Sequence, residues 1–489
     1  MNKLLKGAAT LVAIALAPGS FAATTGSTGG GQPFDNLQPS LAVTQAFVTV
    51  GAFPGRGDPN TAATGDTLGF VYNFAGDFLP GTSRAADGQL LPINTNTALF
   101  SVFGTSYGGN GIQNFALPDL RGTAQVGAGA GPGLAVQTIG QRTGDATVTL
   151  TVDQLPGHDH SLPAGGMTDP TGGGAAFSNL QPSLPMRSLI AVNAEFPNTF
   201  GAASMFLGQI AAFAGDYTPN GWADADGAVL DIVTHVDLFN LIGTTYGGDG
   251  VTNFALPDLR GRLTVGVDAA HSLGAAFGTD LTSVSLAQMP AHDHTLPVDS
   301  TGVTGGSQPL GNVQPSLALN YLIATQGAFP VQSTGTGFLA DNSILGQIVS
   351  FAGDFAPRGW TVADGRLLSI GPNAALFSVF GTTYGGDGIT TFALPDLRGR
   401  TLIGVSLVDG IHIGDVLGKE TNLLTVANLA AHTHTFDVVT PPPPEVPAPA
   451  ALPLLAMACA GLLAMRRYAR PSQRAAESGP TAASGGGSV

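Results

Sequence analysis

Short apolar segments separated by glycine-rich polar stretches recur three times along the chain, in the same order each time. The first segment of each copy is rich in β-branched and aromatic residues and follows an Asn-x-Gln-Pro motif, which starts at Asn36, Asn179 and Asn312. This composition predicts a β-strand, because branched and aromatic side chains fit a pleated surface. A second, shorter strand is predicted before each Ala-Gly-Asp turn, whose glycines are Gly76, Gly215 and Gly353.

A short helix is predicted after these strands in each copy. In the third copy the apolar residues that recur at helical spacing are Leu376, Phe377, Val379 and Phe380. Gly381 follows them, and glycine is common just past a helix C-terminus because it accepts a positive φ. A stretch of variable length then leads to a histidine pair in every copy, and this variability indicates a surface loop.

A polar, glycine-rich string follows each predicted helix and is almost identical in the three copies. It reads TTYGGDGITTFALPDLRGR in the third copy, and the three strings occupy Thr105–Thr123, Thr244–Arg262 and Thr382–Arg400. Asp387 can cap neighbouring amides in a tight loop, and Asp396 with Arg398 can orient the turn at Gly399. The alternative, a catalytic or ligand clamp, is weaker, because no nucleophile lies nearby and the loop lacks the Lys and Ser/Thr of a phosphate cradle.

The composition favours turns and short strands and argues against nucleic acid as a partner. The chain has 489 residues, of which 70 are Gly and 34 are Pro, and many glycines mean many turns. Lys and Arg number 18 against 33 Asp and Glu, giving a formal net charge of −15. Binding to phosphate backbones needs clustered basic side chains. Cys459 is the single cysteine, which excludes an intrachain disulfide.

The first 22 residues have the form of a secretory signal peptide. Lys3 and Lys6 precede an apolar run from Ala8 to Ala17, and small residues follow it. The run is too short to span a membrane, and it has no polar face, so an amphipathic first helix is the weaker alternative.

The last 52 residues predict a sorting or membrane signal. A proline-rich linker (438–449) precedes an apolar segment (450–467) and a polar tail (468–489). The Val446–Ala450 stretch, the apolar segment and the arginines after it resemble PEP-CTERM-like sorting tags of Gram-negative bacteria. That resemblance implies transport to the cell surface and removal of the tag. The tail is longer than such tags usually carry, so a permanent membrane anchor is an alternative.

The segments Gly69–Thr123, Gly208–Arg262 and Gly346–Arg400 resemble the phage tail collar domain. This domain also occurs in microcystin-dependent proteins, which share the histidine pair and the Asn-x-Gln-Pro motif. The resemblance implies intertwined β-rich trimers that serve attachment rather than catalysis. The first copy departs at Ser83, Asn110 and Thr123, and we therefore expect its packing to be degraded or differently paired.

Six of the nine histidines form three His-x-His pairs: His158 and His160, His292 and His294, and His432 and His434. On a strand, residues i and i+2 face the same way, so each pair presents two imidazoles together. Three pairs around one axis would supply six nitrogens for a divalent transition metal ion. The resemblance to tail fibres, which bind metal in this way between three chains, supports that hypothesis. Loop histidines bonded to backbone are the alternative, and His235, His271 and His412 have no matching partners.

The sequence thus predicts a β-rich α+β fold of three tandem collar repeats, at 32–165, 175–300 and 308–437. An intrachain pseudo-trimer and a homotrimer both remain open. The predicted function is non-enzymatic: a secreted or surface-anchored bacterial structural or adhesion protein, with a cell-surface glycan or matrix component as partner. A phage tail fibre or collar component is the alternative. A metal-dependent hydrolase is less favoured, because a six-histidine site leaves no open coordination position.

Overall fold

The structure is a computed structural model that describes residues 20–56, 58, 61–62, 67–79, 83–197, 205–330 and 343–439. The chain divides into a unit of Met1–Ala23 with Asp437–Val489 and a second unit of Thr24–Phe436, which holds the repeats. The predicted apolar segment and polar tail lie outside the described residues, as do most of the predicted signal peptide and linker. Within the described part of the chain, no helix is long and apolar enough to cross a membrane.

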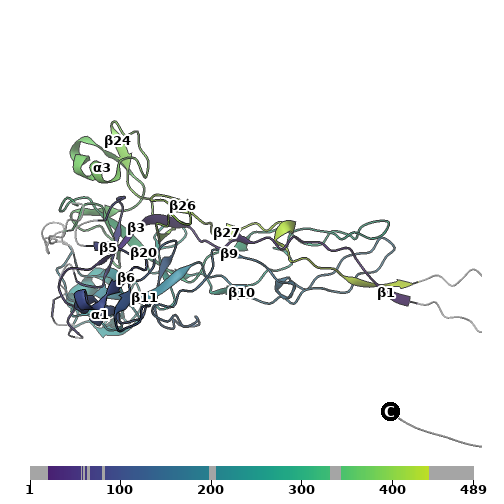
Figure 1. Cartoon of the computed structure of the whole chain (residues 1–489), viewed down its shortest axis with the longest axis horizontal. Helices are drawn as coiled ribbons and strands as arrows, with labels where there is room; N and C mark the ends of the chain where they lie inside the picture. Colours follow the sequence, from purple (N-terminus) through teal and green to yellow (C-terminus); the bar gives the residue numbers. More distant parts are fainter. Residues whose placement is uncertain are drawn as a thin grey trace, which may run out of the picture. The chain divides into compact units, whose positions relative to one another are not determined.

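The predicted β-rich fold with short helices is confirmed (Figure 1). Each repeat is built on a nine-residue strand, and these are β3 (Ser40–Val48), β11 (Ser183–Ala191) and β20 (Ser316–Ala324). Each long strand pairs with a shorter antiparallel strand, namely β4 (Val71–Phe74), β12 (Gln209–Phe213) and β21 (Gln347–Phe351). It also pairs with a three-residue strand, namely β5 (Ser83–Ala85), β13 (Trp222–Asp224) and β22 (Trp360–Val362).

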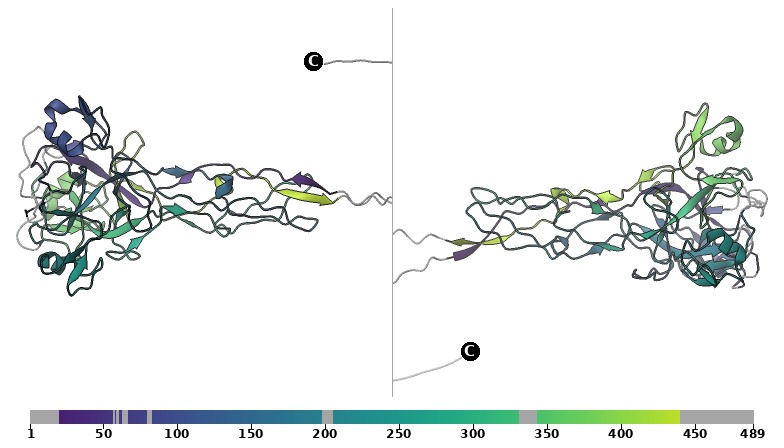
Figure 2. Two further views of the ribbon diagram at one scale, coloured as in Figure 1. Left: turned by 90° about the horizontal axis from the view of Figure 1, so that it is seen from below. Right: turned by 180° about the vertical axis from the view of Figure 1, so that it is seen from behind.

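A two-stranded hairpin and one helix complete each collar segment. The hairpins are β6 (Leu90–Pro92) with β7 (Asn114–Ala116), β14 (Val229–Asp231) with β15 (Asn253–Ala255), and β23 (Leu367–Ser369) with β24 (Thr391–Ala393). The helices are α1 (Thr97–Phe103), α2 (Val236–Ile242) and α3 (Ala374–Phe380). Each helix lies apart from the other two (Figure 2). Single 3₁₀ turns occur at Ile93–Thr95, Val152–Gln154, Gly371–Asn373 and Val426–Asn428.

The predicted helix is confirmed in all three repeats. In α3 the side chains of Leu376, Val379 and Phe380 are buried, and Gly381 ends the helix at φ 56°. The glycine string after it folds back on the hairpin: Gly386 has φ 97°, and a Cβ there would lie 2.4 Å from the Cα of Phe392. Only glycine fits this position, which explains why the three copies share the Tyr-Gly-Gly motif.

Strands are exchanged between consecutive repeats. The exchanged strands are β8 (Ala124–Gly127), β16 (Leu263–Gly266) and β25 (Thr401–Gly404). β8 runs parallel to β11 of the second repeat, β16 to β20 of the third, and β25 to β3 of the first. These strands begin the stretch that the sequence predicted as a surface loop, and that prediction is wrong for them. Ala124 and Val126 are buried because β8 fills the space beside the next repeat.

Three short two-stranded ribbons are formed by residues that lie outside the collar segments. They are β2 (Phe34–Asp35) with β9 (Thr147–Val148), β10 (Phe177–Ser178) with β18 (Leu281–Thr282), and β19 (Leu310–Gly311) with β27 (Thr421–Asn422). One apolar cluster takes a residue from each ribbon: Phe34, Phe177 and Leu310. Two further strands, β17 (Ala276–Phe277) and β26 (Val416–Leu417), pair with β20 and β3. The terminal strands β1 (Ser20–Thr24) and β28 (Thr435–Val439) pair with each other.

The first repeat is not degraded within the described residues, so that expectation is wrong. β5 pairs with β3 as β13 pairs with β11, and Ser83 is buried at the position of Trp222. Asn110 replaces an aspartate, and its Oδ1 still accepts the N–H groups of Ile112, Gln113 and Asn114. An amide oxygen serves here because the loop needs only an acceptor.

Candidate metal centre

The aspartate of the glycine string is a structural cap, as predicted. Asp387 Oδ1 accepts the backbone N–H groups of Ile389, Thr390 and Thr391 at 2.9, 2.8 and 2.7 Å. The hydrogen bond from the Thr390 hydroxyl and those from the backbone hold the pKa of Asp387 below its usual value. The carboxylate is therefore occupied by its own loop.

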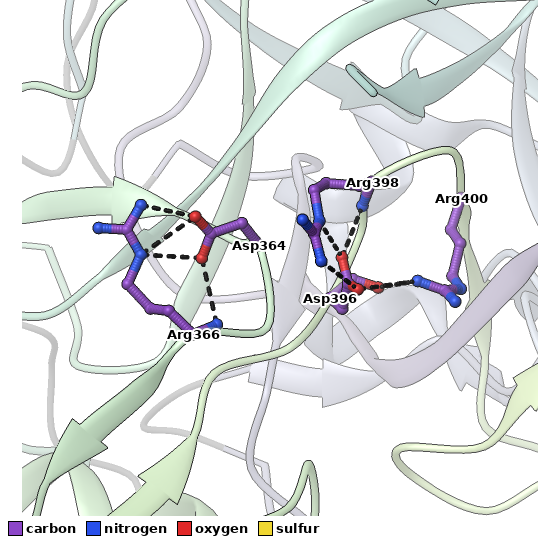
Figure 3. Close-up of polar contacts among 5 residues, drawn as sticks. All are labelled: Asp364, Arg366, Asp396, Arg398 and Arg400. Carbon is purple, nitrogen blue, oxygen red and sulfur yellow. Dashed lines mark hydrogen bonds and ion pairs between the residues drawn. The ribbon is translucent and has the colours of Figure 1, made fainter. Parts of the chain in front are cut away.

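The Asp and Arg side chains of the same string pair with one another (Figure 3). The Arg398 guanidinium donates to Asp396 at 2.9 Å, and Arg400 donates to the Asp396 carbonyl oxygen at 3.0 Å. A second pair, Arg366 with Asp364, lies beside it. Pairs this exposed contribute little to stability, and their charges satisfy each other. This arrangement favours the structural interpretation over a ligand clamp.

The six predicted histidines are brought together, and all are buried. The first member of each pair forms one triangle: Nε2 of His158 lies 3.2 Å from Nε2 of His292 and 3.1 Å from that of His432. The third side, between His292 and His432, is 3.3 Å. Residues from all three repeats therefore meet at one point.

The second member of each pair forms a neighbouring triangle. The ring centroids of His160, His294 and His434 are 4.8, 4.8 and 4.7 Å apart. Within each His-x-His pair the two rings are separated by 5.4 Å. The two triangles thus face each other as two layers of three rings.

Backbone carbonyl groups fix the tautomer of all six rings. In the first triangle, Nδ1 lies 2.9 Å from the carbonyl oxygen two residues earlier, at Pro156, Pro290 and Ala430. In the second triangle, Nδ1 lies 2.8–2.9 Å from carbonyl oxygens of Gly302, Gly26 and Asp169. A carbonyl oxygen can only accept, so each Nδ1 carries the proton. Each neutral ring then presents an Nε2 lone pair.

These lone pairs have no donor among the described residues. Nε2 of His160, His294 and His434 is buried without a hydrogen-bond partner, and the other three Nε2 atoms contact only one another. Burial lowers the pKa of His158 to about 3 and those of His292 and His294 to about 4. Burial also lowers the pKa values of His432 and His434. For these five rings the neutral form, which can bind a metal ion, is therefore the stable one at neutral pH.

The spacing suits a transition metal ion. Metal–nitrogen bonds of about 2.1 Å place adjacent nitrogens of an octahedron about 3.0 Å apart, close to the observed Nε2 separations. The clustered histidines include His158, His160, His292 and His294 as one group of potential ligands and His158, His294, His432 and His434 as another. In a six-coordinate site, each triangle would supply one face of the octahedron.

One detail of the histidine prediction is wrong: the pairs do not lie on regular strands. His158, His292 and His432 each form an isolated bridge, to Thr171, Thr304 and Thr28. Pro156 and Pro290 stand two residues before two of the pairs, but Ala430 stands there in the third pair, which forms the same isolated bridge. The extended backbone still turns both rings of each pair to one side.

A second group of potential ligands was missed by sequence reasoning. Asp268, His271 and Glu420 place one ligand atom each within 4.8 Å of one another, and His271 Nδ1 lies 3.1 Å from Asp268 Oδ1. His271 has no matching partner in the other repeats, so no pattern in the sequence selects it, and Glu420 belongs to another repeat. His235 bonds to Thr234, and the exposed His412 lies beside Asp415.

Comparison with known protein families agrees with this architecture. The family model of the phage tail collar domain matches residues 69–125, 208–264 and 346–402. No curated protein and no solved structure gives a match. All six clustered histidines lie outside the matched segments. The predicted tandem repeats are confirmed, because each of these three segments matches the phage tail collar domain.

Proposed function

We propose that this chain is an exported, non-enzymatic surface or matrix protein whose three repeats form an intrachain pseudo-trimer closed by one divalent transition metal ion. The observation that carries the proposal is the convergence of six Nε2 lone pairs from three repeats. Three lone pairs about 3.2 Å apart repel one another. A cation among them converts that repulsion into coordination.

Cyclic contacts between the repeats support closure within one chain. The exchanged strands run from the first repeat to the second, from the second to the third, and from the third back to the first. The tyrosine of each glycine string follows the same cycle: Tyr107 donates to the carbonyl oxygen of Ala214, Tyr246 to Ala352, and Tyr384 to Ala75. Each repeat thus takes the place that a separate chain has in a homotrimer.

The ligand set argues for a structural metal rather than a catalytic one. Catalytic zinc sites keep one position for water or substrate, whereas six imidazoles fill an octahedron. Nδ1 of every ring is also bonded to backbone, so none is free to act as a general base. A metal-dependent hydrolase would need a ligand to leave.

A surface role is supported by the collar domains and by the export signals of the sequence. We propose a cell-surface glycan or matrix component as the partner. A cleft of about 330 Å³ between the first and second repeats offers amide and charged groups that can bond hydroxyls, among them Gln137, Arg187, Asp224 and Arg260. A phage tail component is the alternative that the collar matches favour; a signal peptide counts against it, because virions assemble in the cytoplasm.

Native mass and metal content of the purified full chain test the proposal together. One metal ion per monomeric chain is the expected result. A metal-bound trimer would instead place the axis between chains, as in a homotrimer. No bound metal after supplying Zn²⁺, Ni²⁺, Co²⁺ or Fe²⁺ would overturn the metal centre.

Two double variants separate the metal centre from other histidines. His292→Ala with His294→Ala should abolish stoichiometric metal binding, because one repeat then supplies no ligand. His235→Ala with His412→Ala is the matched control, since both side chains lie outside the cluster. Equal metal content in the two variants would contradict the proposal.

A further inference from the structure

Three glutamines, one from each Asn-x-Gln-Pro motif, form a closed ring that the proposed function does not use. The backbone N–H of Gln38 donates to Oε1 of Gln181 at 2.9 Å, that of Gln181 to Gln314 at 2.7 Å, and that of Gln314 to Gln38 at 3.1 Å. The three residues are 2%, 0% and 1% exposed. The ring is therefore one of the most deeply buried polar features of the described chain.

The ring fixes which way each side-chain amide is turned. Oε1 must face the neighbouring N–H, so the Nε2 group of each glutamine is assigned without ambiguity. Nε2 of Gln38 reaches Ser316 Oγ at 3.5 Å, and Nε2 of Gln314 reaches Ser183 Oγ at 3.3 Å. Both are long hydrogen bonds. Nε2 of Gln181 is buried with no partner among the described residues.

Several N–H groups of the ring therefore lack an acceptor. Each amide nitrogen carries two hydrogens, so Gln181 leaves both unpaired and Gln38 and Gln314 leave one each. The Oε1 atoms already accept the ring N–H groups, and each serine hydroxyl donates to a glutamine carbonyl oxygen, so the acceptor left at each serine is its Oγ, which two of the amides reach only by long hydrogen bonds. Buried donors without partners are rare in folded proteins.

Buried residues flank each glutamine along the chain, both before it and after it. Phe34, Phe177 and Leu310 precede the three glutamines and share one buried cluster. The long strands that follow begin with buried serines and leucines. Nε2 of Gln181 is itself buried from bulk solvent, and a bound species would satisfy its N–H groups.

We propose that the glutamine ring binds one small monoanion of chloride size. The unpaired groups of the ring are N–H donors, which favours an anion over a cation. A water molecule would bring two hydrogens of its own, which would need further acceptors. A halide accepts several N–H groups and brings no hydrogens, so it matches this set better than water does. The site shares no residue with the histidine cluster and does not depend on metal.

Crystals of the full chain grown in sodium bromide provide the direct test. Bromine scatters anomalously, and we expect one peak within hydrogen-bond distance of at least two of the three Nε2 atoms. Density for a water molecule at the ring, with bromide found only on the surface, would overturn the proposal. So would a ring in which the amides bond to protein groups alone.

A solution experiment tests the same site with a matched control. The unfolding midpoint of the wild-type chain should rise when chloride replaces gluconate at constant ionic strength, because a ligand that binds only the folded state stabilises it. Gln181→Glu, which places a negative charge in the ring, should lose this chloride response. Gln141→Glu, at an exposed glutamine, should keep it. A chloride response that is absent from the wild type, or equal in both variants, would contradict the proposal; if Gln181→Glu does not fold, Gln181→Met takes its place.

Discussion

The histidine pairs and the glycine string are both polar, and both occur once in each repeat. They differ in whether their polar atoms already have hydrogen-bond partners. Asp387 of the glycine string is exposed, and its acceptor capacity is filled by its own loop. His160, His294 and His434 are buried, and their Nε2 atoms have no partner in the described chain. Repetition within the sequence is equally strong for both motifs. What separates a scaffold motif from a binding site is whether its polar atoms are already satisfied.

The same contrast predicts how each region responds to change. Substitutions in the glycine string should act through backbone geometry and be felt locally. Substitutions in the histidine cluster should act through a bound ion and affect the closure of all three repeats.

Removing one histidine triangle should have the largest effect. His160→Ala, His294→Ala and His434→Ala together leave three ligands in place of six, so stoichiometric metal binding should be lost. When free metal exceeds the dissociation constant about 1,000-fold, binding adds about 4 kcal/mol to the free energy of unfolding. Denaturant unfolding with and without metal measures this term. The variant should show no metal-dependent shift, and a full shift would contradict the assignment.

Acid should destabilise the metal-free protein through the same histidines. Burial lowers the pKa values of His158, His292 and His294 from about 6.5 to about 3–4. Between these values the unfolded chain binds more protons than the folded one. The contribution of these histidines to the free energy of unfolding is therefore fully present above about pH 6.5. It is lost as the pH falls towards 4.

Denaturant unfolding in the presence of a chelator at several pH values measures this dependence. His412→Ala should follow the wild type, because that side chain is exposed. The triple variant at the second triangle should show a shallower dependence. A wild-type stability that is flat from pH 7 to pH 5 would contradict the burial of neutral imidazoles.

Gly386→Ala should destabilise the glycine string by about 2–3 kcal/mol. The residue has φ 97°, and the added Cβ would lie 2.4 Å from the Cα of Phe392, whose backbone cannot yield. Gly371→Ala is the control, because no atom lies within 4 Å of its added Cβ, and its stability should change by less than about 0.5 kcal/mol. Metal content should stay unchanged in both variants. A loss of metal in Gly386→Ala would show that the two regions are coupled.

The sequence predicted the local elements well because their signals are local. The strand of β20 and the helix of α3 follow from residue type and spacing, and Gly381 marks the helix end. The exchanged strand β8 was missed, because its burial depends on β11 of the next repeat, far away in the chain. No periodicity within four residues can reveal a partner of that kind.

The candidate site shows the same limit. The histidine pairs were visible because two ligands lie in one motif, whereas the Nδ1 bonds that fix the tautomers go to residues far away in the chain, such as Gly302 and Gly26. The glutamine ring was not foreseen for a related reason. Gln38, Gln181 and Gln314 stand in an obvious motif, but their bonding is cyclic between repeats.

The smallest effect is expected at the ion pair of the glycine string. Arg398→Ala removes a side chain that is 55% exposed and whose guanidinium donates to Asp396. Exposed pairs contribute less than about 1 kcal/mol, and Arg400 remains to bond the Asp396 carbonyl oxygen. Denaturant unfolding should therefore detect a change below about 1 kcal/mol, with metal content unaffected. A larger loss, or a change in attachment to surfaces without loss of stability, would mean that Arg398 serves a partner, and the glycine string could then no longer be treated as scaffold alone.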